Sequence, residues 1–108
     1  MLINFDNIKE TEVKNFHNGD KVIYFKTYED NDFKIMKSIM VPGSSNGLHE
    51  HIDNAEIIYV ISGKGYAIVD GEKEILVPGV VTYCKKGSSH AIFNDGGEDL
   101  VCFNVVNK

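Results

Sequence analysis

The sequence predicts an all-β protein, and two observations indicate this fold class. Short apolar runs rich in Val, Ile, Tyr and Phe recur along the chain, and these residue types favour a pleated sheet. A turn signal such as Pro42-Gly43 or Asp70-Gly71 follows most of the runs. This alternation is typical of a β-sandwich or barrel rather than of alternating strands and helices. The runs cover Phe33–Val41, Glu56–Ser62, Gly65–Val69, Glu74–Val77, Val80–Cys84, His90–Phe93 and Leu100–Val106.

The length and composition fit a single domain over residues 1–108. A chain of 108 residues with 43% hydrophobic residues is long enough to bury a core without disulfide cross-links. No repeat, low-complexity tract or shift in composition marks a linker. We interpret residues 1–30 as an N-terminal extension. Within it, Phe5–Phe16 forms either a short helix or an extra strand, and Lys21–Tyr28 forms a strand.

The charge of the chain excludes several classes of partner. The net charge is -5 and all 11 basic residues are lysines, which argues against a nucleic-acid or anionic-membrane surface. No segment resembles a signal peptide or is long enough to span a membrane, so we expect a cytoplasmic protein with no membrane partner. Cys84 and Cys102 each lie in an apolar run. We expect buried free thiols, with a disulfide as the alternative in an oxidising compartment.

Three of the four histidines fall in a pattern that predicts a shared site. His49 and His51 are two residues apart, and residues two apart on a strand point to the same face. Glu56 begins the next apolar run, where alternation places it on the same face as Ile58. An inward carboxylate among apolar neighbours is costly unless a positive charge meets it. His90 begins a later run, from which it can reach the same space.

This set of side chains predicts a site for one divalent first-row transition metal. Three neutral imidazoles and one carboxylate suit Fe, Mn, Co, Ni, Cu or Zn, whereas calcium and magnesium prefer oxygen ligands. A pair of histidines alone is weak support, because two surface imidazoles explain it equally well. The joint spacing of His49, His51, Glu56 and His90 is what favours the metal.

The first part of this pattern resembles the first sequence motif of the cupin family. It runs from Gly43 to Gly63 in the order Gly, five residues, His-x-His, four residues, Glu, six residues, Gly. The histidines of the motif are His49 and His51, and its glutamate is Glu56.

The second motif of the family is similar to residues 79–94. It has the order Gly, five residues, Pro-x-Gly, two residues, His, three residues, Asn, and its histidine here is His90. Lys85 stands where the family has proline, and Val80 replaces an aspartate often found after the first glycine. Both departures concern turn and strand geometry rather than metal ligation. The two motifs together span residues 43–94, about half of the chain.

The resemblance implies a single-domain cupin: a double-stranded β-helix, or jelly-roll-like barrel, with the metal held by His49, His51, Glu56 and His90 inside the barrel mouth. It also implies a homodimer, in which the N-terminal strand either extends the partner's sheet or covers its own barrel. The family includes dioxygenases, isomerases, epimerases, decarboxylases, lyases, sugar-binding sensors and storage proteins. The resemblance therefore predicts the fold and the metal rather than one reaction.

We expect a metal-dependent enzyme that acts on a small enolisable or polyhydroxylated molecule, such as a dioxygenase, isomerase or lyase. The missing arginines favour a neutral or metal-chelating substrate, because carboxylates and phosphates are commonly bound by guanidinium groups. Candidates for a general base are Tyr83, Lys37 and Glu50, although a packing or surface role explains each of them better. The alternatives are a cupin that binds or senses a small ligand or sugar without converting it and, less favoured, a structural or storage role.

Overall fold

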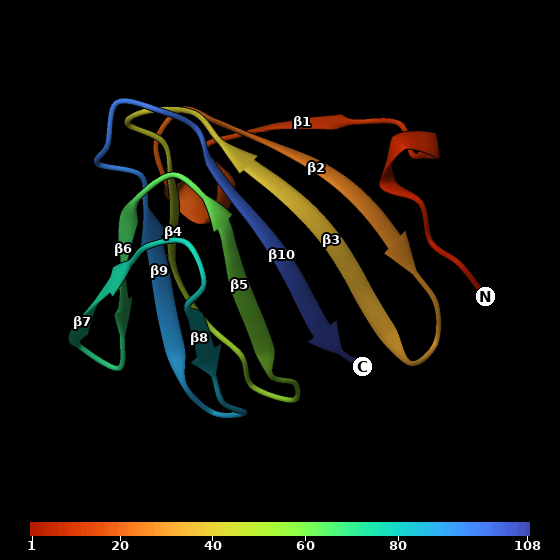
Figure 1. Ribbon diagram of the computed structural model, residues 1–108. Coiled ribbons are helices and arrows are strands. Elements are labelled where there is room, and N and C mark those ends of the chain that lie inside the picture. Colours follow the sequence, from red (N-terminus) through yellow and green to blue (C-terminus); the bar gives the residue numbers. More distant parts are fainter.

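Two antiparallel β-sheets make up the protein in a computed structural model that describes all 108 residues (Figure 1). The larger sheet has six strands in the order β1-β2-β3-β10-β5-β8. These strands are β1 (Thr11–Lys14), β2 (Val22–Glu29), β3 (Phe33–Met40), β10 (Leu100–Asn107), β5 (Glu56–Ser62) and β8 (Val81–Cys84). The smaller sheet has the order β4-β9-β6-β7. It contains β4 (Ser45–Glu50), β9 (Ser89–Phe93), β6 (Gly65–Val69) and β7 (Glu72–Leu76).

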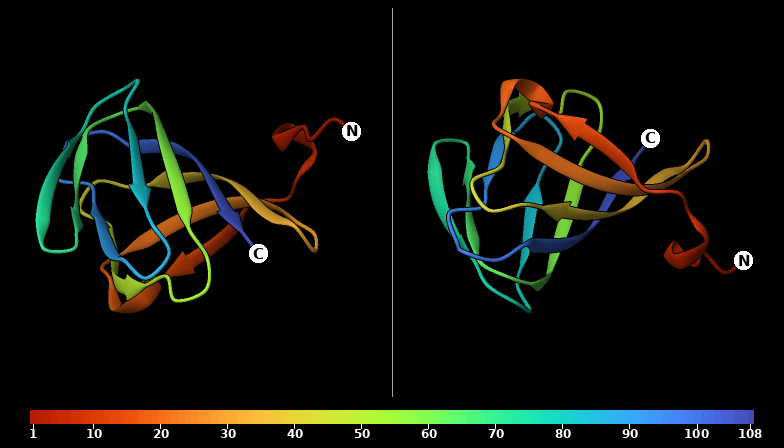
Figure 2. Two further views of the ribbon diagram at one scale, coloured as in Figure 1. Left: turned by 90° about the horizontal axis from the view of Figure 1, so that it is seen from below. Right: turned by 90° about the horizontal axis from the view of Figure 1, so that it is seen from above.

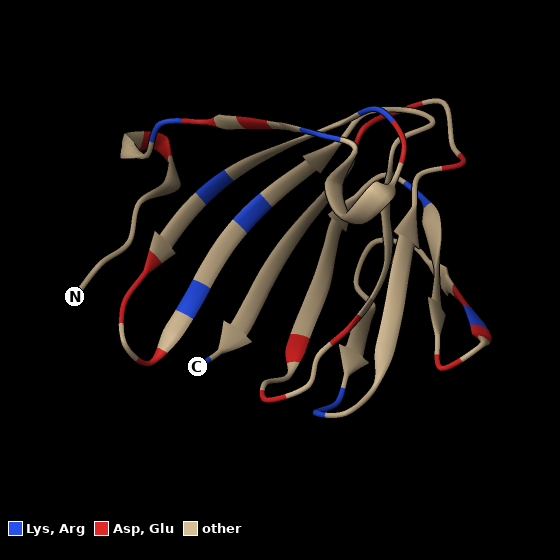
Figure 3. Ribbon diagram, turned by 180° about the vertical axis from the view of Figure 1, so that it is seen from behind, with Lys and Arg blue, Asp and Glu red and all other residues tan.

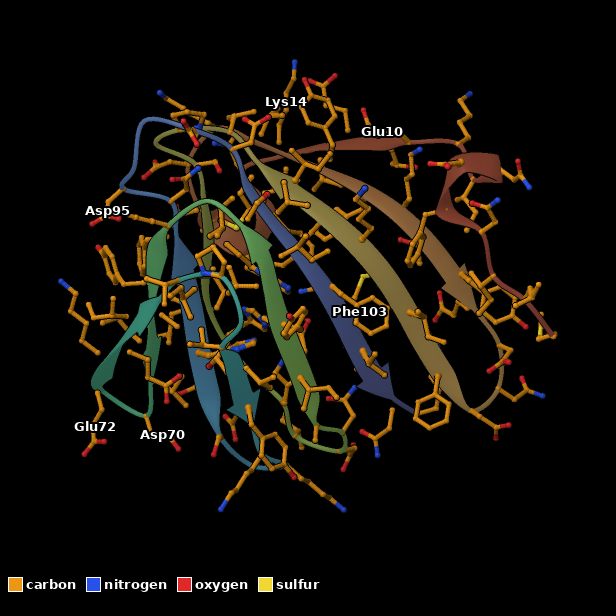
Figure 4. All side chains as sticks on the ribbon, in the orientation of Figure 1. Glu10, Lys14, Asp70, Glu72, Asp95 and Phe103 are labelled. Atoms are coloured by element: carbon orange, nitrogen blue, oxygen red, sulfur yellow. The ribbon has the colours of Figure 1, made fainter.

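The two sheets face each other and enclose the core, as the views from below and above show (Figure 2). The all-β, jelly-roll-like fold predicted from the apolar runs is therefore confirmed. Alternate residues of each strand point inward, as expected for half-buried strands. In β10, for example, Leu100, Cys102 and Asn104 are buried, while Phe103 lies on the outer face (Figure 4). The core cluster contains Ile23, Met40, Ile58, Val60, Ala67, Leu76, Ile92, Leu100 and Cys102.

The N-terminal extension contains both a short helix and an extra strand, the two alternatives that the sequence allowed for Phe5–Phe16. A short 3-10 helix, η1 (Phe5–Asn7), is followed by β1 and by a second 3-10 turn, η2 (Phe16–Asn18). The predicted strand over residues 21–28 is confirmed as β2, which pairs with β3 of the same chain. Its apolar face covers its own core, with Ile23 only 1% exposed. The homodimer stays a prediction.

Tight turns determine how the strands reach the site end of the barrel. Asp70 and Gly71 both have positive φ, 48° and 83°, and form a tight hairpin turn between β6 and β7 where the sequence predicted a turn (Figure 4). The turn that leads into β9 is closed by a hydrogen bond from the Ser88 amide to the Lys85 carbonyl. Gly87 has a φ of 86° in this turn, a conformation that glycine adopts without strain. Lys85, which stands in the proline position of the motif, therefore does not disturb the turn.

The two cysteines are buried and unpaired, which confirms the prediction of free thiols. Burial raises the pKa of Cys84 to about 11 and that of Cys102 to about 12, so both are protonated at neutral pH. No helix in the structure is long and apolar enough to cross a membrane.

Candidate metal site

Four side chains from both sheets converge at one end of the barrel. His49 lies in β4, His51 directly follows this strand, and His90 lies in β9 of the same small sheet. Glu56 is the first residue of β5 in the large sheet. One ligand atom of each lies within 4.8 Å of the others. The structure therefore brings together all four residues that the sequence selected, and we call them the histidine–glutamate cluster.

The ring nitrogens of the histidine–glutamate cluster face one another at close range. Nε2 of His90 lies 3.0 Å from Nε2 of His51 and 3.0 Å from Nε2 of His49. Oε1 of Glu56 lies 3.2 Å from Nε2 of both His51 and His90. A register shift in the pairing of β4 with β9 precedes the point where His49 and His90 lie opposite each other. This pairing places the two rings side by side.

Hydrogen bonds at the outer side of the rings orient two of the imidazoles. Nδ1 of His49 lies 2.7 Å from the Gly47 carbonyl oxygen, which can only accept. Nδ1 of His51 lies 2.7 Å from the amide oxygen of Asn54. In the neutral rings Nδ1 therefore carries the proton, and Nε2 presents a lone pair to the centre of the cluster. Nδ1 of His90 is buried without a partner.

Burial and contacts within the cluster shift the pKa values of its members. Burial alone would raise the pKa of Glu56, but hydrogen bonds with His51 and His90 outweigh it and lower this pKa to about 2. The hydrogen bond with Glu56 in turn raises the pKa of His51. Burial lowers the pKa of His49 to about 4, so this ring is neutral at neutral pH. Glu56 is thus a buried anion that requires positive charge from its neighbours or from an ion.

The donor set fits a transition-metal ion. Nε2 of His90 lies within hydrogen-bond distance of two other ring nitrogens and one carboxylate oxygen, and a single proton on this atom cannot satisfy all three. One cation at the centre would accept the lone pairs of all four groups at once. Imidazole nitrogen with one carboxylate is a combination that first-row transition metals bind well.

A buried hydrogen-bond chain supports the carboxylate of the cluster. The Asn104 amide donates to Oε2 of Glu56 over 3.4 Å, and the Ser38 hydroxyl donates to the amide oxygen of Asn104 over 2.8 Å. All three residues are at most 6% exposed. Asn104 therefore leaves Oε1 of Glu56 free to face the histidines. No sequence signal pointed to Asn104, because its position in β10 depends on strand register.

We expect the Asn104→Leu variant to be destabilised by about 1–3 kcal/mol, because leucine leaves Oε2 of Glu56 and the Ser38 hydroxyl buried without partners. Chemical denaturation of the metal-free protein measures this loss of unfolding free energy. Adding Ser38→Ala to the variant should recover part of the loss, since it removes one of the two orphaned groups. An Asn104→Leu variant as stable as the wild type would show that this chain of hydrogen bonds contributes nothing.

A pocket of about 490 Å³ opens onto the histidine–glutamate cluster. Of the three candidates for a general base, only Glu50 lines it, and its side chain is exposed. Tyr83 is 51% exposed and lies outside the pocket lining, as does Lys37. The pocket wall also includes His17, the one histidine that the sequence pattern left out. The ring of His17 stacks on that of His49 with 3.8 Å between the ring centroids.

Comparison with known proteins agrees with this fold. Residues 36–106 match the family model for the cupin domain. An oxalate-binding protein of Thermotoga maritima is 38% identical over 65 residues, which are 60% of this chain. The matched region spans about half of that relative, 54% of its length.

Solved structures show the same architecture over the whole chain. The crystal structure of a protein described as a predicted oxalate decarboxylase from Thermotoga maritima has a TM-score of 0.89 at 28% sequence identity. The match covers 99% of this chain and 98% of that one. An RmlC-like cupin from Shewanella frigidimarina has a TM-score of 0.82 at 12% identity, with 98% and 88% of the two chains covered. The second likeness concerns the fold alone.

Proposed function

Since this chain belongs to the cupin family, we propose that it is a metal-dependent enzyme for a small molecule that chelates metal through oxygen atoms. His49, His51, Glu56 and His90 would hold one divalent first-row transition metal. The observation that carries the proposal is the convergence of three ring nitrogens and one carboxylate oxygen within 4.8 Å, next to a pocket that His49, His51 and Glu56 line.

The residues of the chain have separate tasks in this proposal. The three histidines would donate neutral nitrogen, and Glu56 would neutralise one charge of the ion. Asn104 and Ser38 hold the carboxylate in place. When bound, the ion supplies Lewis-acid chemistry to substrate oxygens. Glu50 is the one acid–base candidate from the sequence that lines the pocket.

The names of one relative and one structural neighbour support one chemical class of substrate. One relative is named for oxalate binding, and one structural neighbour is described as a predicted oxalate decarboxylase. Oxalate is a small dianion that chelates metal through two oxygens, so it belongs to the class that the site favours. We propose a small chelating carboxylic acid as the ligand, with oxalate as the first compound to test.

Binding without conversion is the second candidate function, and the position of two residues favours it. Tyr83 and Lys37 lie outside the pocket, so neither can act on a ligand held there. A site that lacks these two acid–base candidates is suited to capture a chelating ligand without converting it.

The test is to load the protein with Mn, Fe, Co, Ni, Cu or Zn and titrate each form with oxalate by calorimetry. We expect at least one form to bind oxalate at about one ligand per chain, and the metal-free protein to bind none. NMR of the incubated ligand then separates the two functions, because formate indicates decarboxylation and unchanged oxalate indicates binding alone. Loaded protein that binds neither oxalate nor any other chelating acid would contradict the proposal.

A further inference from the structure

Lys34 is a lysine on the inner face of the large sheet. In β3 the residues Lys34, Met36, Ser38 and Met40 alternate with outward residues, and the last three are buried. Lys34 is half-buried and lines the same pocket as the histidine–glutamate cluster. Inward-facing lysines are normally paired with an acid. Lys34 has no acidic oxygen within 4.0 Å: its cross-strand neighbour Glu29 is bonded to Lys108, and Lys34 acts on Glu29 only through the longer-range attraction of their charges.

Strand register places Lys34 and Glu56 at the same level of the sheet, on either side of β10. Val106 of β10 lies opposite Lys34 on one side and opposite Glu56 on the other. The backbones of Lys34 and Glu56 are therefore two strand spacings apart, about 10 Å. Figure 3 shows that the lysines of β3 and the acidic start of β5 lie on neighbouring parts of the sheet, with β10 between them. Lys34 thus lines the pocket from β3, and β10 separates it from Glu56.

His17 adds a second polar group to the pocket wall. The side chain of His17 is exposed and lines the pocket. Its backbone is left-handed, with φ 52° and ψ 41°, which is uncommon for a residue other than glycine. Strained backbone of this kind persists where surrounding contacts fix it, and it concentrates at functional sites.

A close contact between two backbones fixes the strained turn. A Cβ atom on Gly47 would lie 2.0 Å from the His17 carbonyl oxygen, and one on Gly19 would lie 2.1 Å from the Ser45 carbonyl oxygen. Only glycine allows η2 to approach β4 this closely. The result of this approach is that the His17 ring stacks on the His49 ring at the wall of the pocket.

The charges around the pocket favour an anion with two negative charges. A divalent ion with Glu56 and three neutral imidazoles has a net charge of about +1, and Lys34 raises the local sum to about +2. Among the other charged groups of the pocket wall, Glu29 is paired with Lys108. Glu50 and Asp53 add two negative charges on exposed side chains, where water screens them. A dicarboxylate would balance the combined charge of the ion, Glu56 and Lys34 more fully than a monocarboxylate.

We propose that Lys34 and His17 form an anion-binding subsite for the oxygens of a chelating dicarboxylate that the ion does not hold. This inference rests on the proposed function, because it requires the ligand to bind at the ion. It also shows how a chain without arginine recognises a dianion: the lysine supplies the charge, and the imidazole supplies a directed N–H donor.

The experiment compares oxalate with glycolate, a chelator that carries one negative charge. Both acids are titrated into cobalt-loaded protein, and the change in the visible spectrum of the cobalt reports binding. We expect Lys34→Met to raise the Kd for oxalate about tenfold and the Kd for glycolate much less. Lys34→Arg keeps the charge and should retain the preference for oxalate. Lys37→Met removes a lysine from the outer face of the same strand and should change neither Kd.

His17 is tested with two variants that separate its ring from its N–H group. His17→Phe keeps an aromatic ring against His49 and removes the donor, so the preference for oxalate should fall about threefold or more. His17→Gln keeps a donor and should retain part of the preference. Cobalt content must stay at the wild-type value in each variant, and Lys34→Gln replaces Lys34→Met if the methionine variant does not fold.

Two outcomes distinguish failure of this subsite from failure of the proposed function. If the loaded wild type binds both acids but the ratio of their Kd values is unchanged by Lys34→Met and His17→Phe, the subsite is wrong and the chelate site stands. If the cobalt-loaded wild type binds neither of these two acids, the subsite is wrong, and the titrations of the other metal forms with other chelating acids decide the proposed function separately.

Discussion

We expect the wild-type protein to be purified with about one first-row metal ion per chain and the His90→Ala variant to lose it, with a drop of about tenfold or more in bound metal. His90 is the residue whose Nε2 contacts all three other members of the histidine–glutamate cluster, so its removal opens the centre of the site. Elemental analysis of protein grown in metal-replete medium gives the metal content directly.

A second variant and a control keep this result interpretable. His90 is 1% exposed, and alanine leaves a hole in a buried position, so His49→Ala repeats the test at a half-buried ligand. His17→Gln removes the remaining imidazole of the pocket wall and should leave the metal in place. Equal metal content in the wild type and in both alanine variants would contradict the assignment of the ligands.

The second large effect is expected for Glu56→Gln. The side chain is 6% exposed and its pKa is held at about 2, so the group is ionised at neutral pH and offers the ion its only negative charge. Glutamine has almost the same shape and no charge. We expect metal affinity to fall by at least about 10–100-fold, the loss found when residues that merely support metal ligands are replaced. Competition with a metal-binding dye measures the change in Kd.

The matched control for this variant is Glu50→Gln. It makes the same chemical change on an exposed side chain between His49 and His51, outside the cluster. Circular dichroism should show the same β-rich spectrum for both variants. If Glu56→Gln kept the metal affinity of Glu50→Gln, Glu56 would not be a ligand.

Much of the fold could be predicted because burial follows strand alternation. Glu56, Ile58 and Val60 are buried and Tyr59 is exposed, as the period of two requires. The turn at Asp70-Gly71 was predictable because it needs positive φ at both residues, and Asp-Gly is a sequence that adopts this conformation readily. The turn η2 before β2 was not predictable, since the left-handed backbone of His17 lies against Gly47 of β4. Such contacts between distant segments leave no local sequence signal.

The candidate site, like the fold, could be predicted from the sequence only in part. The convergence of His49, His51, Glu56 and His90 could be predicted from their spacing together with the resemblance to a family. The roles of Asn104 and Lys34 could not, because both depend on which residues of β3, β5 and β10 lie opposite one another. Register between strands distant in sequence is set by the packed core, and a single sequence does not state it.

The position of Glu56 on one sheet and of the three histidines on the other has an energetic consequence. An ion held by all four would tie the two layers of the sandwich together, so that separating them would require its release. Unfolding free energy would then rise with the free concentration of the ion, by about 2.7 kcal/mol at 100 times the Kd. Under metal limitation the lifetime of the folded protein, and not only its chemistry, would depend on the supply of the ion.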